Sequence, residues 1–212
     1  MSEARWIRVA EIVGAVARQA LADRGLSRIA LLDDGSEQAD LAARLLAHGL
    51  GEAAVVRVTV TAAEVEPLLP AWPGVPRDRV DDELRRMRAR LTDALPAHPA
   101  SKTELMMGGP LPPEPLLPLG DLWAADVLAL GAAWSASAEL RSMADEAGGI
   151  ETLDAALRRL VDRRDSLGWD QALPPAVRER VRLAIRGGAA WRRDPFLVPK
   201  LGSRTLGTDL FE

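Results

Sequence analysis

The segment from residue 28 to residue 51 constrains the fold of this 212-residue chain more than any other. It reads RIALLDDGSEQADLAARLLAHGLG, and its apolar run at residues 29–32 is typical of a short buried strand. An acidic turn follows, and then apolar residues recur at helical spacing until the glycines at 49 and 51. A strand, a tight turn and a helix in this order predict the start of a parallel βαβ unit.

The rest of the chain supports an α/β fold in a single domain spanning residues 1–212. The β-branched run at residues 55–60 predicts the next strand, which completes the βαβ unit. Residues 67–76 are interrupted by Pro and Gly and are expected to form a loop. Apolar residues at helical spacing predict further helices over residues 4–22, 78–95, 122–134, 152–165 and 175–187.

The segment from residue 96 to residue 120 is dense in proline. Proline removes a backbone donor and disrupts helices, so we expect neither a central strand nor a helix here. The segment is also too long for a simple connection. We therefore interpret it as a rigid functional loop or as a loop that becomes ordered against a partner.

Composition excludes several classes of function. The chain has no Cys, which excludes disulfides, thiolate metal sites and Cys nucleophiles. Its net charge of -4 gives no broad attraction to nucleic acid. The first residues carry charges of both signs, and no apolar run is long enough to span a membrane. We expect a cytoplasmic protein that binds neither nucleic acid nor a membrane.

The acidic turn poses the main functional question. A turn between a strand and a helix places backbone N–H groups where α/β proteins hold phosphate. Here the turn begins with Asp33 and Asp34, and two carboxylates oppose an anionic ligand. The same residues make an ordinary helix start, with Asp34 as the N-cap and Glu37 as its capping-box partner. The electrostatic sign favours the helix cap over the phosphate loop.

Several stretches, in order along the chain, resemble the synthetase domain of NAD synthetases. These stretches are SKTEL at residues 101–105, PLGDL at 118–122, SAELR at 137–141, LDAALRRLVD at 153–162, and the pairs Arg192-Arg193 and Pro199-Lys200 followed by RTLG at 204–207. The resemblance implies a three-layer fold of the adenine nucleotide alpha hydrolase type, with a mostly parallel sheet flanked by helices. It also implies ATP-dependent adenylation of a carboxylate, followed by transfer to ammonia.

The same resemblance implies a set of site residues. The pyrophosphate loop of the family falls on residues 33–38, with the sequence Asp33, Asp34, Gly35, Ser36, Glu37 and Gln38. Lys102 and Asp121 would also contact the nucleotide, although Asp121 equally suits an N-cap and Lys102 a surface position. Glu37 and Glu104 would hold Mg²⁺. Arg86 or Arg88 would contact the substrate, or would simply be surface charge.

The chain also departs from the pattern of the family. The loop keeps one glycine and neither of the serines of Ser-Gly-Gly-x-Asp-Ser. Residues 124 and 125 are alanines where the family has Lys-Thr, and the part after the first helix is shortened. No glutaminase domain lies within the 212 residues.

Two hypotheses follow from these sequence features. The favoured hypothesis is a divergent relative without the full ATP-dependent activity, acting as a structural or regulatory subunit. Its partner would be a second copy, a related synthetase or a glutaminase. The alternative is an active amide ligase that uses ATP and Mg²⁺.

Overall fold

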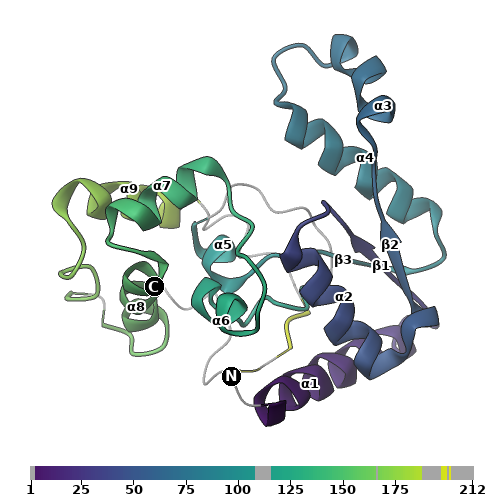
Figure 1. The fold of residues 1–212 in the computed structure, drawn as a ribbon, viewed down its shortest axis with the longest axis horizontal. Helices are drawn as coiled ribbons and strands as arrows, with labels where there is room; N and C mark the ends of the chain where they lie inside the picture. Colours follow the sequence, from purple (N-terminus) through teal and green to yellow (C-terminus); the bar gives the residue numbers. More distant parts are fainter. Residues whose placement is uncertain (1–2, 108–115, 166, 188–196, 200, 202–212) are drawn as a thin grey trace.

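A three-stranded parallel sheet lies at the centre of the computed structural model, which describes residues 3–107, 116–165, 167–187, 197–199 and 201. The strands are β1 (Ile29–Leu32), β2 (Val55–Val58) and β3 (Leu95–Ala97), in the order β2-β1-β3 (Figure 1). Ile29 pairs with Val55 on one side and with Leu95 on the other. The strand–turn–helix that the sequence predicts is confirmed, because α2 (Glu37–Leu50) follows β1.

Helices cover both faces of the sheet, which gives three layers. Ile29 and Leu31 of β1 share an apolar cluster with α1 (Glu3–Ala22) and α2. The alternate residues Ala30 and Leu32 pack instead with Ala89 of α4 (Arg77–Leu91). This alternation follows from the two-residue period of a strand. The α/β class with a parallel sheet between helices is therefore confirmed.

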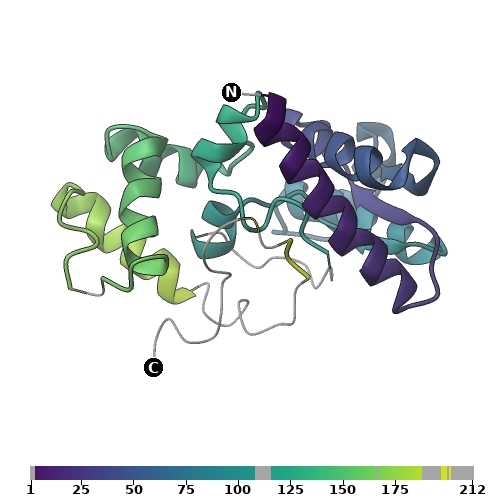
Figure 2. The same ribbon diagram turned by 90° about the horizontal axis from the view of Figure 1, so that it is seen from below.

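A second group of helices lies beside the β3 edge. It consists of α5 (Lys102–Met107), α6 (Ala124–Ala129), α7 (Ala138–Glu146), α8 (Ile150–Val161) and α9 (Pro175–Gly187). In Figure 2, α7, α8 and α9 (green) lie on the left, and the sheet with its covering helices lies on the right. Helices α5, α7, α8 and α9 surround a separate apolar cluster, which includes Leu157 and Val181, whereas Val127 of α6 packs in the cluster around the sheet. Within the described part of the chain, no helix has both the length and the apolar character needed to cross a membrane.

The structure corrects the expectation for the proline-rich segment. Residues 102–107 form the helix α5, contrary to the expectation, whereas residues 95–97 form β3, which lies at the edge of the three strands and is not a central strand. The amide of Leu95 donates to Arg28 on the β1 side at 2.8 Å, whereas that of His98 donates to Leu116 on the other side at 3.0 Å. Successive residues of a strand face opposite sides, so the missing N–H of Pro96 costs no hydrogen bond to β1. Residues 108–115, with four of the prolines, lie outside the described residues.

Other element boundaries also differ from the expectations. The helix expected over residues 122–134 is only α6, and Gly131 follows it with a φ of 82°. The region expected to be a loop at 67–76 continues from α3 (Ala62–Val65) into the 3-10 helix η2 (Glu66–Ala71). A second 3-10 helix, η1 (Glu52–Ala54), precedes β2. Helix α7 was not predicted, and the strand expected to reach residue 60 ends at Val58.

Candidate functional site

The turn after β1 lies at the carboxyl end of the parallel strands, where open α/β sheets commonly bind ligands. It engages three of its own backbone amides. The amide of Gly35 donates to Asp33 Oδ1 at 2.8 Å, and that of Ser36 donates to Asp34 Oδ1 at 3.0 Å. The amide of Ala39, in the first turn of α2, donates to Ser36 Oγ at 3.1 Å. Carboxylates and a hydroxyl therefore occupy the donors that a phosphate would use.

Ser36 is the N-cap of α2, which corrects the sequence expectation that placed Asp34 there. The capping-box role expected for Glu37 is also wrong, because Glu37 is the first residue of the helix. Gly35 precedes the cap with a φ of 79°, a conformation that suits glycine. Asp34 instead stabilises the turn itself through the Ser36 amide.

Arg57 of β2 pairs with Asp33 of the turn and with Asp40 of α2, and the sequence analysis missed it. Its Nε lies 2.5 Å from Asp33 Oδ2, and its guanidinium also pairs with Asp40 at 2.5 Å. Burial acts to raise the pKa of Asp33, but the hydrogen bonds from Arg57 and Gly35 outweigh it and lower that pKa. The pattern that could have indicated this pair is the single arginine, Arg57, within the β-branched run at residues 55–60, because a charged residue in such a strand often has a buried partner of opposite charge.

Gln38 of α2 and Glu104 of α5, which the sequence assigned to the nucleotide and to the metal, are in direct contact. Gln38 Nε2 donates to Glu104 Oε2 at 2.6 Å and to the carbonyl of Pro99 at 2.7 Å. The amide and the hydroxyl of Ser101 both donate to the same Glu104 oxygen at 2.7 Å. Burial nevertheless raises the pKa of Glu104 to about 7, and these hydrogen bonds offset the effect only in part.

The segment after α6 packs over the start of α2. The amide of Ala133 donates to Glu37 Oε2 at 2.7 Å, and that of Ser135 donates to Gln38 Oε1 at 3.0 Å. Ser135 Oγ lies 3.5 Å from Asp34 Oδ2. Residues from the middle of the chain thus hold the side chains that the sequence assigned to nucleotide and metal.

The two carboxylates assigned to Mg²⁺ are each engaged by protein donors. Glu37 accepts from Ala133, and Glu104 accepts from Gln38 and Ser101. Among the described residues, no three His, Asp or Glu side chains form a group suited to a metal ion. A Mg²⁺ site of two carboxylates completed by phosphate and water stays a prediction.

Arg86 and Arg88 occupy different surroundings although both lie on α4. Arg86 pairs with Glu83 at 3.0 Å and acts electrostatically on His98, which follows β3. Burial, together with the smaller effect of the nearby Arg86 cation, lowers the pKa of His98 to about 4. Arg88 instead bonds the carbonyl of Thr59 at 2.7 Å and pairs with Glu64. Both arginines are thereby linked to the carboxyl end of the sheet, Arg86 through His98 after β3 and Arg88 through Thr59 after β2.

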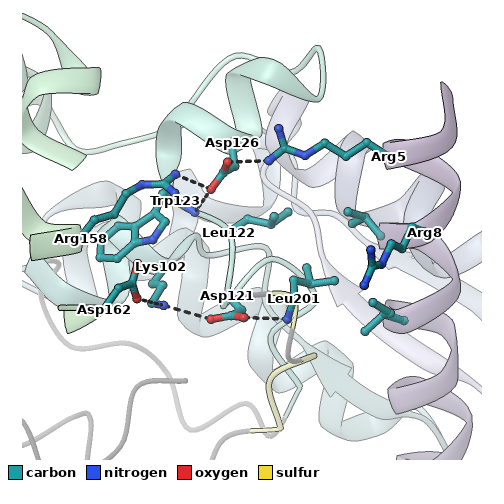
Figure 3. Close-up of a pocket in the computed structure, with 12 residues that line it drawn as sticks. Arg5, Arg8, Lys102, Asp121, Leu122, Trp123, Asp126, Arg158, Asp162 and Leu201 are labelled. Atoms are coloured by element: carbon teal, nitrogen blue, oxygen red, sulfur yellow. Dashed lines mark hydrogen bonds and ion pairs between the residues drawn. The ribbon is translucent and has the colours of Figure 1, made fainter. Parts of the chain in front are cut away.

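Lys102 and Asp121 belong to a second place, a pocket of about 370 Å³ between α1 and the helices α5, α6 and α8 (Figure 3). Lys102 Nζ lies 3.1 Å from Asp121 Oδ1, 3.4 Å from Asp162 Oδ1 and 4.9 Å from the centre of the Trp123 ring. The amide of Leu201 donates to Asp121 Oδ2 at 2.7 Å. The Lys102 side chain is only 1% exposed, so it is a buried ion-pair partner rather than a surface cation.

The residues around the β1 turn do not fit a bound pyrophosphate in this arrangement. Such a group needs N–H donors and a positive potential at the start of the helix. The amides of Gly35, Ser36 and Ala39 are engaged, and Asp33, Asp34 and Glu37 bring negative charge to the same end of α2. What the arrangement achieves is a closed network that fixes α2 to β2, to the segment that joins β3 to α5, and to the segment after α6.

One solved structure with a similar fold is the NH3-dependent NAD synthetase from Campylobacter jejuni in complex with the nitrate ion. The TM-score is 0.61 at 15% sequence identity, and the match covers 85% of this chain and 93% of that chain. No family model matches the chain, and no curated protein matches its sequence. At this identity the likeness shows the fold alone. The resemblance that the sequence suggested is thus confirmed at the level of the fold.

Proposed function

We propose that this chain keeps the fold of an NAD synthetase without its ATP-dependent amide formation, and that it acts as a structural or regulatory subunit. The observation that carries the proposal is the use of three amides, those of Gly35, Ser36 and Ala39, by side chains of the same turn. Donors prearranged for developing charge usually contribute the largest part of catalysis. A turn that has used these donors has little left for a leaving pyrophosphate.

Electrostatics supports the same proposal. The N-terminus of a helix carries a partial positive charge that attracts anions. In α2 this charge is already balanced by Glu37 and Asp40 in the first turn and by Asp34 just before it. Arg57 adds a cation, but it is paired with both Asp33 and Asp40. Bound Mg²⁺ would offset the remaining negative charge only in part.

Calorimetry with Mg²⁺-ATP tests this proposal directly. Deamido-NAD and ammonium are then added, and AMP and pyrophosphate are assayed in the same sample. We expect no nucleotide binding up to roughly millimolar concentration, which corresponds to a binding free energy weaker than about -4 kcal/mol. We also expect no release of AMP. Release of AMP and pyrophosphate would instead support the alternative, an amide ligase that uses ATP and Mg²⁺ to adenylate a carboxylate. In that case Glu104→Ala should abolish the release.

The proposed partner is a second copy of the chain, a related synthetase or a glutaminase. Helix α4 offers a surface for such a partner, because Met87 is 51% exposed and Leu91 is 87% exposed. These residues are four positions apart and therefore lie on one side of the helix. Trp72 and Val75, shortly before α4, are also exposed.

Light scattering over a range of protein concentrations, alone and with candidate partners, tests the partner proposal. We expect an assembly that Met87→Glu or Leu91→Glu weakens. The matched control is Leu183→Glu, which changes an exposed leucine on α9. A wild-type chain that stays monomeric alone and with every candidate partner would contradict the proposal.

A further inference from the structure

The pocket beside α1 has the size and lining of a small-molecule site. Its volume of about 370 Å³ lies within the usual range for ligand pockets. Val9, Ile12, Leu122 and Leu201 give it an aliphatic part. Four cations and three carboxylates line the remainder, and Figure 3 shows them arranged around the apolar part. Such a lining suits a ligand with an apolar body and a polar end.

The carboxylates of the pocket are all engaged by cations. Asp126 pairs with Arg5 at 2.7 Å and with Arg158 at 2.6 Å. Asp121 and Asp162 pair with Lys102. Three cations thus match three carboxylates, and Arg8 is the fourth cation of the lining. Arg8 is exposed, and no ion pair or hydrogen bond joins it to the part of the chain that the structure describes.

The position of Arg8 in α1 adds to the positive potential of the pocket. Arg5 lies in the first turn of α1, where the helix dipole is positive, and Arg8 lies in the second turn, where it adds the charge of its own guanidinium. Only Glu3 in the first turn opposes this charge.

We infer that this pocket binds a small organic anion with one anionic group and a short apolar body. The Arg8 guanidinium pairs with the anionic group, a carboxylate or a phosphate ester, and the body lies against Val9, Ile12 and Leu122. The Arg5–Asp126–Arg158 cluster forms the wall of the pocket on the α6 side. This inference goes beyond the proposed structural or regulatory role and does not depend on whether the chain uses ATP to adenylate a carboxylate.

Calorimetric titration of the full chain tests the inference with hexanoate, hexyl phosphate and uncharged hexan-1-ol. We expect one of the anions to bind with a dissociation constant of about 1 mM or below, as ligand size allows, and the alcohol to bind at least tenfold more weakly. The Arg8→Gln variant should bind the anion about tenfold more weakly, because it loses a charge-assisted contact. Arg8→Lys should retain more affinity than Arg8→Gln.

Arg44→Gln is the matched control, since Arg44 is an exposed arginine on α2 that does not line the pocket. It should leave the affinity unchanged. Preference for hexanoate identifies a carboxylate ligand, and preference for hexyl phosphate identifies a phosphate ester. The inference is overturned if neither anion binds, if the alcohol binds equally well, or if Arg8→Gln binds like the wild type. Equal losses in Arg44→Gln and Arg8→Gln would also overturn it, because the effect would then be one of overall charge.

Discussion

Gly14 of α1 and Gly49 of α2 lie backbone against backbone. A methyl group at Gly14 would lie 2.5 Å from the Cα of Gly49, and one at Gly49 would meet the backbone of Gly14 in the same way. Arg18 of α1 also donates a hydrogen bond to the carbonyl of Gly49. This contact holds α2 against α1 on one face of the sheet, and so it fixes where the start of α2 meets the turn after β1.

Replacing Gly14 with alanine should destabilise the protein. Alanine favours the helix by about 1 kcal/mol over glycine, but overpacking against a backbone that cannot yield costs about 1–3 kcal/mol. We expect a net loss in the free energy of unfolding, measured by urea denaturation. Gly187→Ala in α9 is the control, because a methyl group there meets no atom within 4 Å. A Gly14→Ala protein as stable as that control would contradict the contact.

Replacing Glu104 with glutamine should flatten the dependence of stability on pH. The pKa of Glu104 rises from an ordinary 4.5 to about 7 on folding, so between these values the folded state binds more protons than the unfolded state. Stability therefore falls as pH rises through this interval. Glutamine keeps an acceptor for Ser101 and Gln38 and loses the charge. The free energy of unfolding of Glu104→Gln at pH 8 should therefore exceed that of the wild type by roughly 3 kcal/mol.

Denaturation at pH 5 and pH 8 measures this effect of Glu104. Asp154→Asn is a useful comparison, because burial also raises the pKa of Asp154, to about 6, while the Ala125 amide and the Thr103 hydroxyl bond to it. The two variants should each remove their own part of the pH dependence. If Glu104→Gln kept the full wild-type difference between pH 5 and pH 8, Glu104 would be ionised throughout that range in the folded state.

Replacing Lys102 with methionine should destabilise the protein by about 3–5 kcal/mol. The change leaves Asp121, whose side chain is 0% exposed, without the buried cation 3.1 Å away. The double variant Lys102→Met/Asp121→Asn should regain much of the loss, since asparagine still accepts from the Leu201 amide. Thermal unfolding of both variants measures the coupling. If the double variant were no more stable than Lys102→Met alone, the loss of stability would not come from the broken Lys102–Asp121 pair.

Replacing Ser36 with alanine should cost about 1 kcal/mol, because Ser36 Oγ accepts from the Ala39 amide at the start of α2. The matched control is Ser142→Ala, whose hydroxyl bonds only to Glu146 on the exposed side of α7 among the described contacts. Urea denaturation should show little change in the control. An Asp34→Ala variant that lost more stability than Ser36→Ala would restore Asp34 as the dominant group at this helix start.

Local sequence patterns predicted those helices and strands whose bounds do not depend on contacts with distant parts of the chain. The apolar run at 29–32 and the helical spacing in α1, α2 and α9 were sufficient to place those elements. Strand β3 was not predictable in this way. Pro96 is tolerated there because its nitrogen faces away from β1, and the sequence does not show which way it faces. Helix α6 ends earlier than its apolar spacing suggests, because the chain turns at Gly131.

The candidate site depended more strongly on tertiary structure. The family resemblance assigned Gln38 to the nucleotide and Glu104 to the metal. In the structure Gln38 Nε2 lies 2.6 Å from Glu104 Oε2. No local pattern indicated that Ala133 and Ser135 would donate to Glu37 and Gln38, since about 100 residues of sequence separate the partners. The sequence also did not show that Lys102 and Glu104 lie in different places, Lys102 in the pocket beside α1 and Glu104 beside Gln38. Residues two apart in a helix do point to different sides.

Leu122 packs in the apolar cluster around the sheet, and Trp123, the next residue, packs in the cluster of α5, α7, α8 and α9. The peptide bond between them thus passes from one core to the other, flanked by the ion pairs of Asp121 and Asp126, and the chain returns to the first core at Val127. Dissolved ions screen the partly exposed pairs of Asp126 far more than they affect apolar contacts. We therefore expect ionic strength to control how cooperatively the two halves melt, with their transitions separating as salt is added.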